Sequence, residues 1–176
     1  GTPYASRLGR LASLGRGVKV HAKVEGLRSL LSEMAEEKII VFTQFRRTLE
    51  FLQRTVRELG EEPAVFHGSL GPGDKDKAVE QFRADRRILI STEAGGEGRN
   101  LQFCRTMVNF DLPWNPMRIE QRIGRIHRLG QTRDTQIFNF TTRDTVEDHV
   151  LRILHTKIQM FELVVGEMDM VLGQWS

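Results

Sequence analysis

Short, continuous apolar runs alternate along this chain with longer stretches in which apolar residues recur every three or four positions. A short apolar run bounded by polar residues is typical of a strand buried on both faces, and the wider spacing is typical of an amphipathic helix. The pattern predicts strands at Ile39–Phe42, Ala64–Phe66, Ile88–Ile90, Thr106–Phe110 and Gln136–Phe140. It predicts helices at Lys23–Glu36, Arg46–Leu59 and Asp74–Ala84, and a helix that runs into a turn at 121–131.

Strands that alternate with helices of this length predict an α/β fold with a parallel, helix-covered sheet. Ligands of such sheets meet the loops that follow the carboxyl ends of the strands. These loops are 43–46, 67–73, 91–100 and 111–116. Beyond residue 144, Val146, Val150 and Ile153 begin a long helical pattern that is too apolar to stand free in water.

The composition is compatible with a single domain. The chain has 176 residues, 39% of them hydrophobic, and a formal net charge of +3. Basic residues gather in the N-terminal arm and the body, which is compatible with a nucleic-acid partner. Cys104 is the only cysteine, so an internal disulfide is ruled out, and we interpret it as a small, partly buried apolar residue. No apolar run approaches a membrane span, so we expect a cytoplasmic protein, and the initial Gly1 indicates an excised piece of a longer chain.

The segment 121–131 carries arginines at every third position, Arg122, Arg125 and Arg128. Residues three apart lie on neighbouring positions of a helix, so Arg125 and Arg128 can point the same way and bind a polyphosphate with their planar donor groups. A solvated basic helix is the plainer interpretation of this spacing. Trp114 has two interpretations as well, because it can stack against a nucleic acid or pack in the core.

The chain lacks the usual means of seating a nucleotide. Gly96 and Gly98 do not start a dinucleotide-binding motif, because Leu101 stands where the third glycine belongs. Gly68 to Gly73 has P-loop spacing, but Asp74 follows where Gly-Lys-Ser/Thr is required. No metal site is predicted, and His67 and His127 are interpreted as loop residues able to contact a ligand. The chain has arginines that can bind a phosphate but no motif that binds the rest of the nucleotide. We therefore expect it to form only part of an enzyme's active site, with the rest on another segment.

Five ordered motifs then identify a family resemblance: 38–45, 66–69, 90–101, 111–116 and 121–131. In this order they resemble the second RecA-like lobe of Swi/Snf-type helicase-like ATPases of superfamily two, over roughly residues 20–165. The segment 97–100, Glu-Gly-Arg-Asn, departs from the commoner Gly-Leu-Asn ending and resembles the bacterial branch associated with RNA polymerase. The resemblance implies a RecA-like three-layer domain with a mainly parallel sheet. It divides the chain into a basic arm (1–22), the lobe (23–143) and a C-terminal brace helix and tail (144–176).

The resemblance also implies roles for single residues. Arg125 and Arg128 match arginine fingers that reach the γ-phosphate of ATP, and Gln121 helps to orient the phosphate and the attacking water. Glu97, Gly98 and Asn100 match positions near the nucleotide, while ATP and Mg²⁺ are held mainly by the missing N-terminal lobe. The residues implied on the DNA track are Thr43, Gln44, Arg46, Ser69, Thr92 and Trp114.

These implications predict the C-terminal motor lobe of a DNA-stimulated ATPase that translocates on double-stranded DNA without separating the strands. The expected partners are duplex DNA and the N-terminal lobe of the parent chain, with RNA polymerase as a further candidate. The expected location is the cytoplasm, in association with the nucleoid. The activity would serve chromatin or transcription remodelling, and the isolated domain is expected to be inactive. Two alternatives stay open: a catalytically inactive nucleic-acid-binding regulatory module, and a lobe of a strand-separating helicase.

Overall fold

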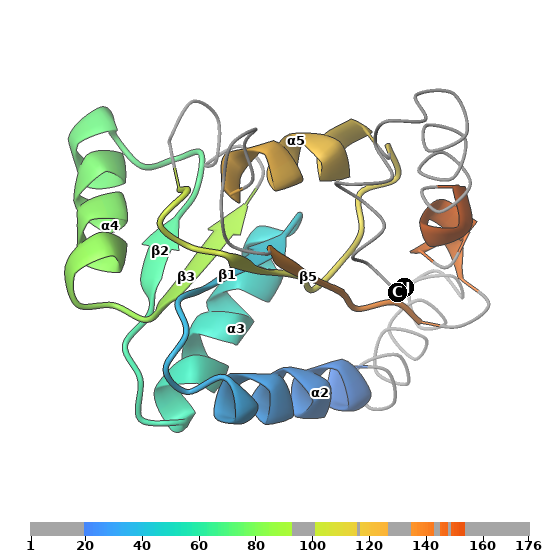
Figure 1. Ribbon diagram of the computed structural model, residues 1–176, viewed down its shortest axis with the longest axis horizontal. Helices are drawn as coiled ribbons and strands as arrows, with labels where there is room; N and C mark the ends of the chain where they lie inside the picture. The colour runs from blue at the N-terminus through green and yellow to red at the C-terminus, as the bar shows by residue number, and fades with distance from the viewer. Residues whose placement is uncertain are drawn as a thin grey trace, which may run out of the picture.

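A parallel sheet of five strands forms the centre of the domain (Figure 1). The computed structural model describes residues 20–92, 101–115, 117–126, 135–142, 145–147 and 149–153. The strands are β1 (Ile39–Thr43), β2 (Ala64–Phe66), β3 (Ile88–Thr92), β4 (Thr106–Asn109) and β5 (Gln136–Asn139). Their order across the sheet is β2-β3-β1-β4-β5, with every neighbouring pair parallel. The predicted α/β fold with a parallel sheet is therefore confirmed.

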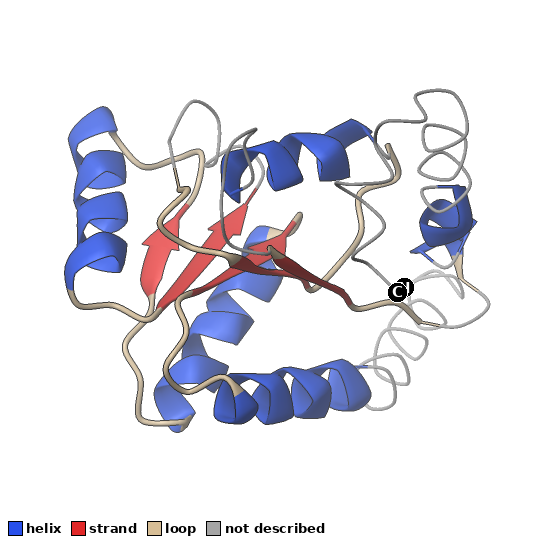
Figure 2. Ribbon diagram, viewed as in Figure 1, coloured by secondary structure: helices blue, strands red, loops and turns tan. Residues whose placement is uncertain are grey.

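Helices cover both faces of this sheet, which gives three layers (Figure 2). The helices are α2 (Val20–Glu33), α3 (Arg46–Glu58), α4 (Pro72–Ala84) and α5 (Met117–Ile126). Side chains alternate between the faces of a strand, so Val41 and Ile90 face α2 and α3, while Phe42 and Leu89 face the other way.

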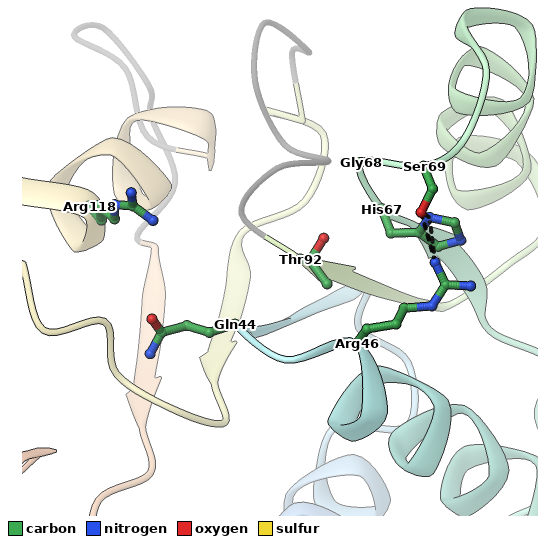
Figure 3. Close-up of a pocket in the computed structure, with 7 residues that line it drawn as sticks. All are labelled: Gln44, Arg46, His67, Gly68, Ser69, Thr92 and Arg118. Atoms are coloured by element: carbon green, nitrogen blue, oxygen red, sulfur yellow. Dashed lines mark hydrogen bonds between the residues drawn. The ribbon is translucent and has the colours of Figure 1, made fainter.

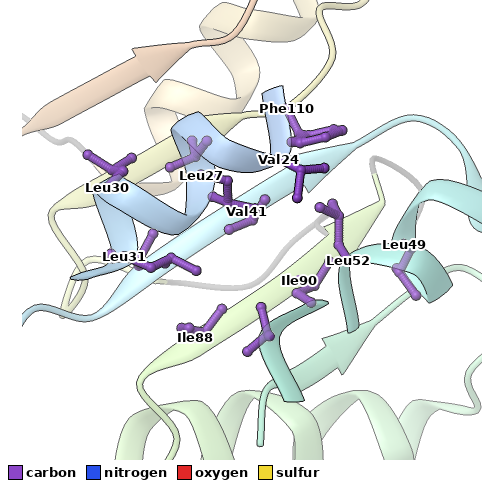
Figure 4. Packing of buried hydrophobic residues seen from close by; sticks show 13 residues of the cluster. Val24, Leu27, Leu30, Leu31, Val41, Leu49, Leu52, Ile88, Ile90 and Phe110 are labelled. Carbon is purple, nitrogen blue, oxygen red and sulfur yellow. The ribbon is translucent and has the colours of Figure 1, made fainter. Parts of the chain in front are cut away.

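The first core cluster fills the space between the sheet and the pair α2 and α3 (Figure 4). Leu27 and Leu52 are fully buried there against Ile39 and Val41 of β1. The second cluster joins the opposite face to α4 and α5 through Phe82 and Ile126. Each such side chain contributes about 1.5–3 kcal/mol by leaving water, so the two clusters hold the strand ends in fixed positions.

The helix α2 was predicted three residues too late at both ends, since it runs from Val20 to Glu33 rather than from Lys23 to Glu36. Its end has a physical reason that lies far away in sequence. The guanidinium of Arg87 donates to the carbonyl oxygens of Leu31 at 3.3 Å and Met34 at 2.8 Å. Because Arg87 donates to these carbonyl oxygens, they do not require amide donors from a further helical turn. The helix therefore ends at Glu33 and the chain turns towards β1.

Two smaller predictions about single residues are confirmed. Gly60 ends α3 with a φ of 84°, a left-handed conformation that glycine adopts at little cost. Cys104 is buried, and its burial raises the pKa of the thiol to about 12, so it behaves as an inert core residue.

The described part of the C-terminal segment packs on the domain through one apolar and one charged contact. Val150 is buried with Leu112 and Ile119, whereas Val146 and Ile153 remain 49% and 36% exposed. Glu147 accepts hydrogen bonds from the Lys23 ammonium at 2.7 Å and from the Thr142 amide at 3.2 Å. The predicted brace beyond Ile153 and the predicted arm before Val20 lie outside the described residues. No helix in the described ranges has both the length and the apolar character needed to cross a membrane.

Candidate nucleic-acid and nucleotide site

The carboxyl ends of three neighbouring strands border a groove of about 370 Å³ (Figure 3). Gln44 follows β1, His67 follows β2, and Thr92 ends β3. The groove is lined by Gln44, Arg46, His67, Gly68, Ser69, Thr92 and Arg118. Four of these, Gln44, Arg46, Ser69 and Thr92, are residues that the resemblance placed on the DNA track. The parallel strand order brings them to one edge from positions far apart in the chain.

A small polar cluster forms one wall of the groove. Arg46 Nη1 donates to His67 Nδ1 at 2.9 Å and to Ser69 Oγ at 3.1 Å, as the dashed lines in Figure 3 show. The same side chain pairs through Nε with Glu50 at 3.1 Å. Arg46 is half exposed, so its guanidinium remains open to a ligand from the solvent.

His67 is electrically neutral in this arrangement. Burial lowers the pKa of its imidazole below the ordinary value of 6.5, and the nearby charge of Arg46 lowers it further. Because Nδ1 accepts the hydrogen bond from Arg46, the ring proton sits on Nε2. The imidazole therefore adds a hydrogen-bond donor to the wall without adding a charge.

The chemistry of the lining suits a phosphate group. Arg46 and Arg118 supply positive charge on opposite sides, Ser69 supplies a hydroxyl group on the wall of Arg46, and Thr92 supplies a second hydroxyl between the two arginines. Guanidinium and hydroxyl donors of this kind fix the backbone of a nucleic acid and carry no information about its bases. Sequence reasoning missed Arg118, whose signal was a basic residue in the first turn of the helix that follows the motif 111–116.

Thr43, which was predicted to contact DNA, does not line the groove. Its side chain is fully buried, and its hydroxyl donates a short hydrogen bond to Asp111 Oδ2. Asp111 Oδ1 accepts the backbone N–H of Gln44 at 2.7 Å. Burial raises the pKa of the Asp111 carboxyl, and the hydrogen bonds from Thr43 and Gln44 oppose that rise. The side chain of Thr43 is thus committed to Asp111, which also holds the first residue of the loop after β1.

The helix α5 presents two of its arginines in different ways. Arg125 is partly exposed and stands near Gln121, which is exposed one turn earlier. Arg122 is instead buried, with only 4% of its surface exposed. The sequence carried a signal for this burial, because Arg122 lies three residues after Ile119 and four before Ile126, on the apolar face of the helix.

Several predicted nucleotide contacts lie outside the described residues. These are Glu97, Gly98 and Asn100, which follow β3 in the sequence, and Arg128, which follows α5. His127, predicted to contact a ligand, lies outside the described residues as well. Within the described ranges, no group of three or more His, Cys, Asp or Glu side chains could hold a metal ion.

Trp114 is an exposed aromatic residue in the loop between β4 and α5. It is 77% exposed, which excludes the alternative of core packing. Phe45 and Met117 are also exposed, at 59% and 48%. An exposed indole is able to stack or wedge against a nucleic acid.

The sequence matches the family model described as the helicase conserved C-terminal domain over residues 22–130. It is 52% identical over 142 residues to the uncharacterized ATP-dependent helicase YqhH of Bacillus subtilis, a match that covers 81% of this chain and 26% of YqhH. It is 38% identical over 144 residues to the RNA polymerase-associated protein RapA of Sodalis glossinidius, covering 80% of this chain and 15% of RapA. The chain thus spans about a quarter or less of the length of these relatives.

Solved structures with the same architecture support the match. The C-terminal part of the Fun30 ATPase domain superposes with a TM-score of 0.69 at 28% identity, covering 75% of this chain and 44% of that one. The C-terminal domain of the DEAD-box protein Dbp5 gives a TM-score of 0.68 at 25% identity, covering 77% and 78%. Both are RecA-like domains, and the predicted RecA-like three-layer fold is confirmed.

Proposed function

This chain belongs to the family of helicase conserved C-terminal domains, and we propose that it is the second motor lobe of an ATP-driven translocase on double-stranded DNA. The observation that carries the proposal is the groove. Three separate strand ends bring four residues together in this basic groove, which is lined with hydroxyl groups: Gln44, Arg46, Ser69 and Thr92. A surface of this kind binds the phosphate backbone without regard to sequence, as a motor that moves along DNA requires.

In the proposed reaction, ATP and Mg²⁺ are held mainly by an N-terminal lobe, and this chain supplies Arg125 and Arg128 from the segment that begins on α5. A guanidinium that reaches the transferring phosphate stabilises its charge in the transition state, which is worth about 10³–10⁵ in rate in related reactions. Gln121, on the exposed side of α5, would orient the γ-phosphate and the attacking water. Glu97, Gly98 and Asn100 would contact the nucleotide from the loop after β3.

The proposed partners follow from the same assignment. Duplex DNA occupies the groove, and the N-terminal lobe of the parent chain closes on α5. The similarity to RapA makes RNA polymerase a further candidate partner, which favours transcription over chromatin as the setting, with a place at the bacterial nucleoid.

The test uses the two-lobed parent protein. ATPase turnover should rise when duplex DNA is added, and Arg125→Ala should lower the stimulated turnover by about 10³-fold or more. Arg83→Ala, which removes an exposed arginine on α4, is the matched control and should leave turnover unchanged. Stimulated turnover that survives Arg125→Ala contradicts the finger assignment.

The alternatives give different results in the same experiments. A regulatory module predicts a parent protein without ATP hydrolysis, in which duplex DNA still binds. A strand-separating helicase predicts that a forked duplex loses its displaced strand during ATP hydrolysis, whereas the translocase consumes ATP and releases no strand.

A further inference from the structure

Arg122, Asp111 and Thr43 form a buried connection between the helix α5 and the DNA groove. Arg122 Nη1 donates to Asn109 Oδ1 at 2.5 Å and to the carbonyl oxygen of Asp111 at 3.3 Å. Its guanidinium also lies 5.1 Å from the centroid of the Phe42 ring. The helix α5 is therefore fastened to the last residues of β1 and β4 by one buried cation.

The connection continues from Asp111 to the loop that enters the groove. The Asp111 carboxylate accepts the hydroxyl of Thr43 with one oxygen and the backbone N–H of Gln44 with the other, at 2.7 Å. The side-chain amide of Gln44 donates to the carbonyl oxygen of Leu112 at 2.8 Å. The loop after β1 is thus tied to the loop after β4 by three hydrogen bonds, and Gln44 itself lines the groove.

These contacts require explanation because they are costly. A guanidinium and a carboxylate are withdrawn from water where apolar side chains could fill the same space. Hydrogen-bonded and well-packed elements of this kind are able to transmit a displacement, since a shift of α5 moves Asp111 and therefore Gln44. The fastening lies directly between the proposed finger helix and the proposed DNA contact.

We propose that Thr43, Asp111 and Arg122 are positioning residues that couple DNA in the groove to ATP hydrolysis at α5. The inference rests on the proposed function of the two surfaces that it connects. DNA that engages Gln44 and Arg46 sets the position of the loop after β1. Asp111 transmits that position to Arg122, and α5 turns Gln121 and Arg125 toward the γ-phosphate. All three residues are buried, and none of them lines the groove.

The test is the ratio of ATPase turnover at saturating duplex DNA to turnover without DNA, measured in the two-lobed parent protein. Thr43→Val keeps the shape of the side chain and removes only the hydroxyl that Asp111 accepts. We expect it to lower the ratio by between about twofold and thirtyfold, which is the range for residues along a coupling path. Thr43→Ser retains the hydroxyl and should restore the ratio, and the Kd for DNA should stay within about twofold throughout.

A double-mutant cycle tests the path itself. Arg122→Met removes the charge and leaves a long side chain over Phe42, and its effect on the ratio should not add to that of Thr43→Val, because both break one connection. The coupling would be overturned by additive effects of the two substitutions or by an unchanged ratio in Thr43→Val. It would also be overturned if a higher DNA concentration restored the stimulated turnover of Thr43→Val. If Arg122→Met does not fold, the Val and Ser variants of Thr43 decide the question. A parent protein whose turnover does not respond to DNA would instead refute the proposed function.

Discussion

The protonation of His67 can change the charge of the groove wall. Its lowered pKa means that the folded chain binds fewer protons than the unfolded chain just below pH 6.5, so this residue makes the fold less stable as the pH falls through that window. In the proposed complex DNA reverses this preference, because a phosphate beside the ring would favour the charged imidazolium. Protonation also frees Arg46 from Nδ1, so that the guanidinium is available to the phosphate.

We therefore expect the affinity for duplex DNA to rise when the pH is lowered from 7.5 through the histidine range. His67→Asn should remove most of this rise, as measured by fluorescence anisotropy at constant salt. His149→Asn, at an exposed histidine of the C-terminal segment, is the control and should keep the full pH response. An equal response in wild type and His67→Asn would show that His67 does not bind near the phosphate.

Trp114 permits a test that separates binding from folding. Because its side chain is 77% exposed, Trp114→Ala should change the free energy of unfolding by no more than about 0.5 kcal/mol. The loss of one stacking or wedging contact should weaken DNA binding by about fivefold or more. Leu59→Ala removes another exposed apolar side chain, at the end of α3, and should leave the affinity unchanged. A Trp114→Ala variant that unfolds more easily but binds DNA normally would contradict this assignment.

At the scale of elements, the sequence predicted the strands better than the helix ends. The edge strand β2 has the predicted bounds. The central strands β1 and β3 run past their predicted ends only to Thr43 and Thr92, because a run of apolar residues is typical of a strand that is buried on both faces. The end of α2 depends on Arg87, whose contact with Leu31 and Met34 is made only after the chain has folded. No local pattern contains that information.

The contact between α2 and the C-terminal segment gives a prediction about stability. Glu147 accepts the Lys23 ammonium and the Thr142 amide where both charged side chains are largely buried. Glu147→Ala should lower the free energy of unfolding by about 1.5–3 kcal/mol, because it removes hydrogen bonds to a charged group and leaves Lys23 without its counter-charge. Chemical denaturation measures the change.

A matched control breaks an ion pair that water surrounds. Glu62→Ala removes the partner of Arg57 in an exposed pair on the opposite end of the domain, and it should give no measurable change in the denaturation midpoint. Equal effects of Glu147→Ala and Glu62→Ala would show that the C-terminal segment does not stabilise the lobe.

At the scale of the whole molecule, the order of five motifs along the chain predicted both the lobe and the edge at which its loops meet. It did so because parallel strands place all their carboxyl ends together, so that Gln44, Ser69 and Thr92 had to converge. The roles of Thr43 and Arg122 could not be predicted in the same way. The spacing of Ile119 and Ile126 indicates that Arg122 is buried, but it does not name its partners, and only the adjacency of β1 and β4 shows that Asp111 lies between Thr43 and Arg122.

In the proposed DNA complex, the charge of the whole chain and the charge of the groove would make separable contributions to binding. The slope of log K against log salt measures the number of phosphates that the protein neutralises, at about 0.9 per phosphate. Arg46→Ala and Arg54→Ala each lower the net charge from the same starting value of +3, and both residues lie on the exposed side of α3. Of these two arginines, only Arg46 lines the groove, since Arg54 is eight residues, or about 12 Å, further along the helix.

We expect Arg46→Ala to reduce the slope by about one and Arg54→Ala to leave it unchanged, as titrations over a salt series would measure. Equal slopes in the two variants would mean that DNA responds to the total charge and not to this groove.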